Sequence, residues 1–221
     1  MTEATPALLA KARKHLFVAV VSDTLDALGW TRQAMTPGIR PLDESLSFLG
    51  RARTGMYREM FHVQPGNPYE LEIKLVDDLK KGEVCVLGCS GNPRIAPWGG
   101  LLSTASKARG AAACVTDGLV RDIMAIRKMK FPVFAAGIGP LDSKGRGIVA
   151  EIDVPVEVGG VRIEPGDLVF GDADGVVAIP KAIEGEVLKA ALEKVLGEHK
   201  TLAALKRGEK LATVFARYGV L

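Results

Sequence analysis

The sequence predicts a mixed α/β fold, and two patterns along the chain support this prediction. Between residues 50 and 136, short apolar segments alternate with longer segments whose apolar residues recur at helical spacing, as in strand–helix units. Between residues 148 and 179, five short apolar segments follow one another with turn residues between them, which indicates consecutive strands. Because no repeat, low-complexity segment or linker interrupts the chain, we expect one domain over residues 1–221.

Composition and charge exclude several classes of protein. Of the 221 residues, 48% are hydrophobic, which excludes a disordered chain and allows a substantial core. The net charge is only +3, no dense basic block occurs and 5% of residues are aromatic, so we expect no nucleic-acid partner. Three cysteines in apolar settings predict reduced thiols. Without a signal peptide or an apolar run of about 18 residues, we expect a cytoplasmic protein with no membrane contact.

The chain before the first strand predicts two short helices. Residues 5–16 form a basic amphipathic segment, which is the first predicted helix. Residues 24–28 form the second, with Ser22 or Asp23 as its N-terminal cap and Gly29 at its end. The polar, proline-bearing segment that follows shows no strong periodicity.

Four strands and three helices are then expected to alternate. The strands are predicted at residues 50–57, 83–89, 111–116 and 131–136. The helices are predicted at residues 67–80, 100–109 and 119–130. The apolar face of the second of these helices is expected to contain Leu101, Leu102, Ala105 and Ala108. Asp117 and Gly118 are interpreted as the turn that leads into the third helix.

The last third of the chain predicts short strands and then helix. The strands are expected at residues 148–152, 154–158, 161–163, 168–170 and 176–179. Glycine, proline and aspartate at residues 165–167 and 172–175 mark turns between strands. From Lys181 onward, apolar residues at helical spacing predict a long helical region.

The segment that ends with Arg121 and Asp122 carries the candidate site. A pair of glycines opens a predicted helix, whose first backbone N–H groups are free to bind a carboxylate. The residues at that helix start are Gly99, Gly100, Leu101 and Leu102. Arg121 offers a planar, charged fork for the same anion, and Asp122 offers a hard oxygen ligand for a divalent cation. Both are placed in the first turn of the next predicted helix. Together with the glycine-opened helix start, they predict a small 2-oxo acid held against a metal ion.

Both side chains also have a purely structural interpretation. Taken alone, Arg121 is better explained by a surface salt bridge, and Asp122 is commonly just a carboxylate that favours a helix N-terminus. Lys107 falls on the polar face of its predicted helix, so the sequence does not support an aldolase that works through a Schiff base. The surrounding sequence decides between these interpretations.

Three segments resemble the RraA-like family, which contains 4-hydroxy-4-methyl-2-oxoglutarate aldolases and regulators of ribonuclease activity. The segments are GGLLSTASKARG, TDGLVRD and GDLVFGDADGVVAIP. Their most specific element is a glycine or aspartate, then twenty intervening residues, then Arg-Asp, which here is Gly100 followed by Arg121-Asp122. The resemblance runs from about residue 21 to about residue 180, the expected core, with helical extensions on both sides.

This resemblance implies a β/β/α swivelling-type sandwich of mixed sheets with flanking helices. It implies a homotrimer or a hexamer with sites at subunit boundaries, and a divalent-metal (class II) aldolase or decarboxylase. Arg121 would then contact the carboxylate and oxo oxygens of a pyruvate-like group, and Asp122 would bind Mg²⁺ or Mn²⁺. The metal would polarise the carbonyl and stabilise the enolate formed by retro-aldol cleavage or by oxaloacetate-type decarboxylation.

Two positions depart from the family pattern. Some members have aspartate where this chain has Gly100, and others have an acidic residue where this chain has Ala125. Asp122 is then the one expected metal ligand, unless a neighbouring subunit contributes Glu193 or Glu198. No side chain is assigned as the general acid, so we expect an ordered water in that role. The alternative is a non-enzymatic regulator that binds a ribonuclease or another protein.

Overall fold

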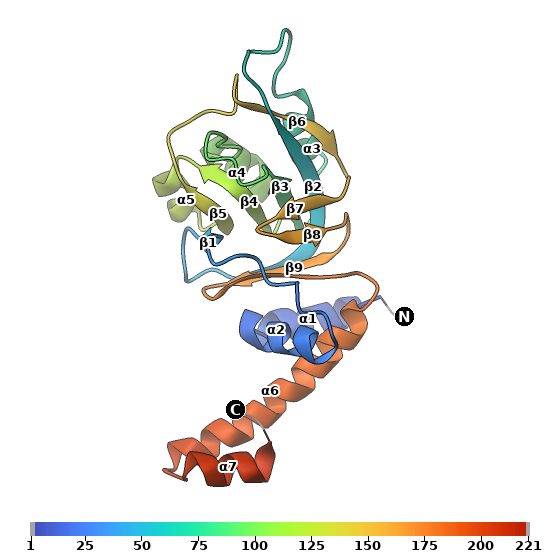
Figure 1. The fold of residues 1–221 in the computed structure, drawn as a ribbon, viewed down its shortest axis with the longest axis vertical. Coiled ribbons are helices and arrows are strands. Elements are labelled where there is room, and N and C mark those ends of the chain that lie inside the picture. The colour runs from blue at the N-terminus through green and yellow to red at the C-terminus, as the bar shows by residue number, and fades with distance from the viewer. Residues whose placement is uncertain (1–2, 220–221) are drawn as a thin grey trace.

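The computed structural model describes residues 3–219, so residues 1, 2, 220 and 221 of the predicted domain lie outside it. The helices are α1 (Pro6–His15), α2 (Val18–Ala27), α3 (Glu70–Asp77), α4 (Gly100–Ala108), α5 (Ile123–Met129), α6 (Glu184–Lys206) and α7 (Leu211–Tyr218). The strands are β1 (Arg40–Pro41), β2 (Phe48–Glu59), β3 (Glu83–Gly88), β4 (Ala113–Val120), β5 (Val133–Ile138), β6 (Gly147–Ile152), β7 (Val156–Val158), β8 (Val161–Ile163), β9 (Leu168–Asp172) and β10 (Gly175–Ile179) (Figure 1). The predicted mixed α/β class is confirmed.

One mixed sheet organises the molecule, with strand order β1-β5-β4-β3-β2-β9-β10 and with β6 paired to β2. Its centre is parallel, because β2, β3, β4 and β5 are neighbours in chain order and α3, α4 and α5 connect them. These connections are the strand–helix alternation that the sequence predicts. Strands β9 and β10 extend the sheet in antiparallel pairing, and β7 and β8 form a separate hairpin.

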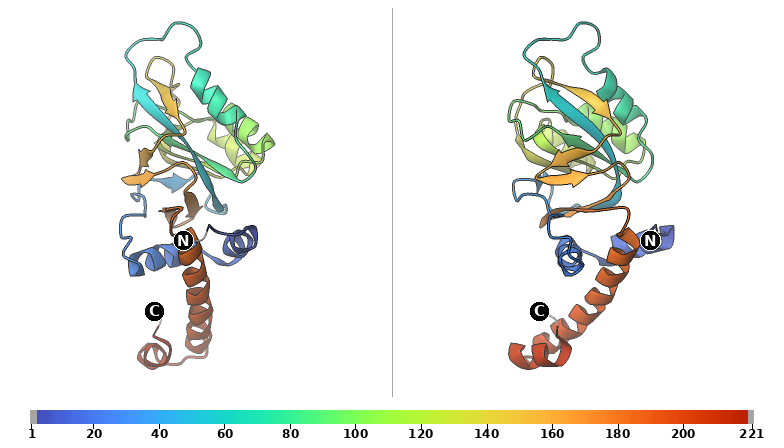
Figure 2. Two further views of the ribbon diagram at one scale, coloured as in Figure 1. Left: turned by 90° about the vertical axis from the view of Figure 1, so that its right-hand side faces the viewer. Right: turned by 45° about the vertical axis from the view of Figure 1, so that its right-hand side comes forward.

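Three layers arise because the parallel strands are buried on both faces. On β3, Cys85 and Leu87 belong to the core under α3, α4 and α5, whereas Val84 and Val86 belong to a core shared with β7 and β8. Figure 2 shows α3 and α4 on the opposite side of the sheet from the β7–β8 hairpin. This is the β/β/α arrangement that the resemblance implies. The three cysteines are buried and reduced, as predicted.

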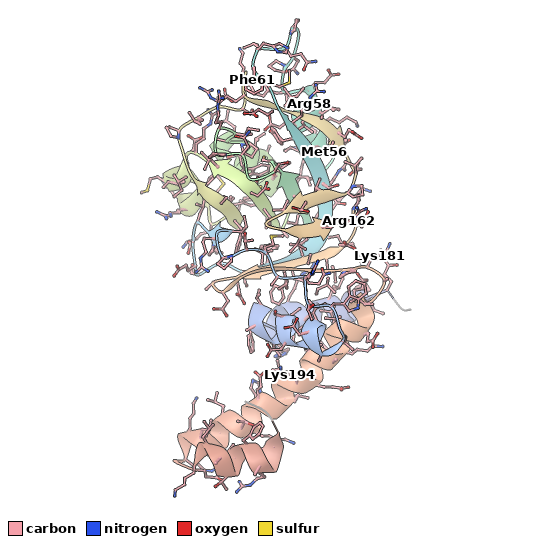
Figure 3. The ribbon with its side chains drawn as sticks, in the orientation of Figure 1. Met56, Arg58, Phe61, Arg162, Lys181 and Lys194 are labelled. Carbon is pink, nitrogen blue, oxygen red and sulfur yellow. The ribbon has the colours of Figure 1, made fainter. Side chains whose placement is uncertain are left out.

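The terminal helices form a second core against the antiparallel end of the sheet. α1, α2 and α6 pack there, with Leu25 and Leu188 buried among residues of β9 and β10. The Nζ of Lys194 on α6, labelled in Figure 3, forms an ion pair with the Oδ2 of Asp23 on α2 at 2.6 Å. Beyond this contact α6 extends away from the sheet and ends beside α7 (Figures 1 and 2). Neither α6, with 23 residues, nor any other helix within residues 3–219 is apolar enough to cross a membrane.

The second helix begins earlier than predicted. α2 starts at Val18, so Ser22 and Asp23 lie inside it and the prediction that one of them caps it is wrong. The cap is supplied from far along the chain, because the Asp172 carboxylate accepts the Val18 backbone N–H at 2.7 Å. A cap from the β9–β10 turn leaves no local signal in the sequence. Gly29 follows the helix with φ 85°, as expected for a residue that ends it.

The predicted turn at Asp117 and Gly118 is also wrong. β4 runs through both residues, although its pairing with β5 becomes irregular there. The Asp117 carboxylate instead accepts the backbone N–H groups of Cys89 and Gly91 and so fixes the loop after β3. Because the strand continues, α5 begins at Ile123, and the candidate Arg-Asp pair precedes the helix rather than lying in its first turn.

Candidate functional site

A cavity of about 330 Å³ opens where the parallel strands end. Its walls come from the segments that follow β2, β3, β4 and β5, and they include Tyr69, Glu72, Gly99, Leu101, Leu102, Arg121, Asp122 and Asp142. In open α/β sheets, ligands bind at the carboxyl ends of the strands, since the loops there converge. Gly100 lines an adjoining hollow that shares Leu101 and Asp122 with the cavity. The fold therefore brings every residue of the predicted site to one place.

The start of α4 lies directly against Asp122. The Gly100 N–H donates to Oδ2 of Asp122 at 3.0 Å, so this carboxylate caps the helix from the opposite wall. The two glycines make the approach possible: a Cβ at Gly99 would lie 2.9 Å from that oxygen, and a Cβ at Gly100 would lie 3.3 Å from the Cβ of Asp122. Asp122 thus occupies the Gly100 N–H, and the helix start leaves the N–H groups of Leu101 and Leu102 for an anion.

The backbone of Asp122 is strained and held in place from both sides. Its φ of 60° and ψ of 32° lie in the left-handed region that residues other than glycine rarely adopt. Its carbonyl accepts the N–H groups of Ala125 and Ile126, which start α5, and the preceding N–H of Arg121 donates to the Trp98 carbonyl. Strain held by surrounding contacts is typical of functional sites, and here it turns the carboxylate toward α4.

Arg121 lines the cavity and keeps hydrogen-bond donors available. Its guanidinium makes one long hydrogen bond, 3.4 Å to the Leu141 carbonyl, and lies 3.9 Å from the Asp142 carboxylate. The side chain is 40% exposed. Because these contacts are long, the guanidinium retains N–H groups that can bind both oxygens of one carboxylate. The contact with Asp142 therefore leaves most N–H donors of the Arg121 guanidinium without a partner, so a surface salt bridge does not account for this side chain.

Asp142 and Tyr69 form a hydrogen-bonded pair on the far wall. The Tyr69 hydroxyl donates to Oδ2 of Asp142 at 2.8 Å. Partial burial alone would raise the pKa of Asp142, but the Tyr69 and backbone hydrogen bonds, together with Arg121, hold that pKa below its usual range. Burial and the same hydrogen bond raise the pKa of Tyr69 to about 12. Near neutral pH this wall therefore carries an anionic Asp142 and a neutral Tyr69.

Glu72 is a candidate functional residue that the sequence analysis misses. It is 6% exposed, and its Oε1 accepts the Tyr57 hydroxyl at 2.7 Å. Burial raises the pKa of Glu72 to about 7; Asp142 adds to this rise, whereas Tyr57 and Arg121 oppose it. A carboxyl group that titrates near neutrality in a cavity is typical of an acid–base residue.

The sequence did contain a signal for Glu72. A buried stripe repeats at intervals of three and four residues along α3 and just beyond its end, and consists of Glu72, Leu75, Val76 and Leu79. A carboxyl group in an otherwise apolar stripe indicates a buried ionisable group. Asp142 and Tyr69 have no such signal, because they lie in irregular segments after β5 and β2.

The two leucines at the helix start differ in burial. Leu102 packs against the core as predicted, but Leu101 is 87% exposed, so its predicted place on a buried face is wrong. Ser103 takes the inward position, where its hydroxyl accepts the Trp98 indole N–H at 2.7 Å. Met124 on α5, which shares the adjoining hollow with Leu101, is 74% exposed. Exposed apolar side chains therefore stand beside Asp122.

A metal ion at this site would depend mainly on Asp122. Among the described residues, no three Asp, Glu, His or Cys side chains gather as a metal-binding group. Gly100 and Ala125 supply no carboxylate, and neither Glu193 nor Glu198 lines the cavity of its own chain. Asp122 itself is exposed and is an oxygen ligand, which suits a hard cation that keeps several waters. The residues fit Mg²⁺ or Mn²⁺ held by one carboxylate together with water and ligand oxygens.

Comparison with known proteins places this chain in a family. Residues 18–178 match the RraA-like family model, described as Aldolase/RraA. A protein from Halalkalibacterium halodurans, provisionally named 4-hydroxy-4-methyl-2-oxoglutarate aldolase, is 38% identical over 175 residues, covering 79% of this chain and 77% of that protein. The crystal structure of an uncharacterised protein from Pseudomonas syringae pv. tomato has a TM-score of 0.85 at 27% identity, covering 97% of this chain and 99% of that chain.

A second solved structure comes from Streptomyces coelicolor. It is RraAS2, described as an unusual member of the RNase ES inhibitor RraA protein family, with a TM-score of 0.78 at 26% identity. The match covers 92% of this chain and 98% of that chain. Because the family model spans most of the sequence and the solved structures share its fold, this chain belongs to the RraA-like (Aldolase/RraA) family.

Proposed function

We propose that this protein is a lyase that cleaves a small 2-oxo acid. The reaction is retro-aldol cleavage of a 4-hydroxy-2-oxo acid to pyruvate, or decarboxylation of an oxaloacetate-type acid. One observation carries the proposal: the donors of Arg121, the start of α4 and the exposed carboxylate of Asp122 meet in one cavity. The aldolase name of the relative from Halalkalibacterium halodurans supports it.

The site residues have separate tasks in this reaction. Arg121 binds the substrate carboxylate and the 2-oxo oxygen through its planar fork, and its charge stabilises the enolate oxygen. The N–H groups of Leu101 and Leu102 bind a further substrate oxygen. Asp122 would hold Mg²⁺ or Mn²⁺, and a bound divalent cation supplies Lewis-acid polarisation of the carbonyl.

A pyruvate-release assay tests this function. The full chain is incubated with Mg²⁺ or Mn²⁺ and a panel of 4-hydroxy-2-oxo acids plus oxaloacetate, and pyruvate is measured with lactate dehydrogenase. We expect turnover that EDTA abolishes and a kcat/KM at least about tenfold lower for Arg121→Lys, since lysine lacks the fork. Arg58→Lys, an exposed position on β2 away from the cavity, is the matched control (Figure 3). Absence of pyruvate release across the panel contradicts the proposal.

A second candidate function is protein binding. RraAS2 is described as a member of an RNase inhibitor family, and this chain lacks the acidic residues that some aldolases have at the positions of Gly100 and Ala125. A regulator of this kind binds its partner through its outer surface. Titration with a purified ribonuclease separates the two functions. If the chain is a lyase, Asp122→Asn at the cavity removes turnover, whereas a regulator that binds through its outer surface keeps its affinity for the ribonuclease in that variant.

We also propose that the active form is a homotrimer or a hexamer with the cavity at a subunit boundary. Leu101 and Met124 expose apolar side chains beside Asp122. On α7, in another part of the molecule, Leu211 and Phe215 also expose apolar side chains. Exposed apolar groups next to a cavity are typical of contact surfaces. Sedimentation is expected to give a mass of three or six 23.5-kDa chains, and a stable monomer at micromolar concentration contradicts this assembly.

A further inference from the structure

Glu72 is a buried carboxyl group in the cavity wall to which the proposed function gives no task. It lies in the first turn of α3, and only its Oε1 is engaged, by the Tyr57 hydroxyl. Among the described residues no cation forms an ion pair with Glu72, and no donor is bonded to its Oε2. A buried carboxyl group with one neutral partner is costly when it is ionised.

The same chain shows how a purely structural buried carboxylate is held. Glu184 is fully buried, and both of its oxygens accept from Arg51, at 2.9 Å each, while Oε1 also accepts the Ala4 backbone N–H. Such pairing compensates the charge and leaves the group no role in proton transfer. Glu72 differs in both respects, because it lacks a cation partner and it faces a cavity.

The charged and titratable groups around Glu72 act in opposite directions. Burial and Asp142 disfavour its ionised form, whereas the Tyr57 hydroxyl and Arg121 favour it. The nearby Cys89 thiol adds no charge, because burial raises its pKa and keeps it neutral. The resulting pKa of about 7 means that protonated and ionised forms both exist near neutral pH. A group that takes up and releases a proton during one turnover needs this balance.

We infer that Glu72 is the proton-transfer residue of the reaction, an inference that rests on the proposed lyase function. As a carboxylate it removes the proton from the C4 hydroxyl while the C3–C4 bond breaks, so that C4 becomes a carbonyl and the electron pair moves to C3 as the enolate. As a carboxylic acid it then returns the same proton to C3, which forms the methyl group of pyruvate. No other reactant is consumed. Tyr57 acts as a positioning residue that holds Oε1.

Exchange of the pyruvate methyl protons tests the second half of this cycle. The full chain with Mg²⁺ is incubated with pyruvate in D₂O, and loss of the methyl signal is followed by proton NMR. We expect exchange with the parent and a rate at least about 100-fold lower with Glu72→Gln, the usual range for loss of a general acid–base group. Glu70→Gln, an exposed position on the same helix, is the matched control and should match the parent.

Proton uptake on ligand binding gives a readout that does not depend on turnover. Oxalate is titrated calorimetrically in buffers of different ionisation enthalpy near neutral pH. Since the ligand charge disfavours a Glu72 carboxylate, the parent is expected to take up part of a proton, and Glu72→Gln to take up none at an affinity within a few-fold of the parent. Tyr57→Phe removes a donor that favours the carboxylate, so maximal uptake should move to higher pH. A purely structural Glu72 would show none of these changes.

The outcomes separate the two proposals. If the parent exchanges pyruvate protons and Glu72→Gln does so equally fast, the role of Glu72 is refuted while the lyase function stands. If the parent neither exchanges pyruvate protons nor cleaves any 2-oxo acid, the lyase function fails and the role of Glu72 fails with it. If Glu72→Gln does not fold, Glu72→Asp is used instead, because it keeps a carboxyl group but shortens the side chain by one methylene. Proton exchange at the parent rate both in Glu72→Asp and in Tyr57→Phe contradicts the inference.

Discussion

Replacement of Glu72 by glutamine is expected to stabilise the fold at alkaline pH and to change little at acidic pH. The folded-state pKa of Glu72 is about 7 and its ordinary value is 4.5. At about 1.4 kcal/mol per pKa unit, full ionisation costs the folded state about 3.5 kcal/mol. Because the folded-state pKa is the higher one, this cost is absent below the unfolded-state value, grows as pH rises and is complete above the folded-state value. Glutamine releases no proton and still accepts from Tyr57.

Urea unfolding of the chain without metal or ligand, at one protein concentration, measures this effect. At about pH 8.5 we expect the free energy of unfolding of Glu72→Gln to exceed that of the parent by up to about 3.5 kcal/mol, and at about pH 5 by no more than about 1 kcal/mol. The exposed control Glu70→Gln should stay within about 0.5 kcal/mol of the parent at both pH values. A difference between Glu72→Gln and the parent that is the same at both pH values refutes the perturbed carboxyl group.

Three further variants test the geometry of the site and fold. Arg121→Lys should weaken oxalate binding about 10- to 100-fold in calorimetry with circular dichroism unchanged, and parent-like affinity would make Arg121 structural. Gly99→Ala places a Cβ 2.9 Å from Asp122 Oδ2, so it should lower stability by about 1–3 kcal/mol and weaken oxalate binding, whereas Gly38→Ala, which has open space around it, should do neither. Asp172→Ala removes the cap of α2 and should cost about 1 kcal/mol in urea unfolding; no loss contradicts the cap.

Local periodicity predicts the central architecture because each strand and helix between β2 and β5 carries its own pattern of apolar residues. Where prediction fails, the deciding contact is remote. The cap of α2 comes from Asp172, and Asp117 stays in its strand because its carboxylate binds the loop after β3. Leu101 fits an apolar helical stripe, but the inward position goes to Ser103, which Trp98 holds by a hydrogen bond.

In the candidate site, too, some contacts follow from local sequence patterns and others depend on remote parts of the chain. Gly100 and Asp122 can be paired from sequence because the intervening segment is one helix and one strand, which return the chain to the same sheet edge. Asp142 and Tyr69 reach the cavity from other strand ends, so no spacing in the sequence predicts their contact. Glu72 is partly predictable from sequence. Its place in an apolar stripe predicts that it is buried, but not that it faces the cavity.

The central claim, that Arg121 and Asp122 form one site for a 2-oxo acid and a divalent cation, is tested most directly by calorimetric titration of Mg²⁺ with and without oxalate. With one protein carboxylate as the expected ligand, Mg²⁺ should bind weakly alone and at least about fivefold more tightly with oxalate, which adds oxygen ligands, and oxalate should gain equally from Mg²⁺. Asp122→Asn should abolish this coupling. Magnesium affinity that is the same with and without oxalate, and the same in Asp122→Asn, would contradict the account.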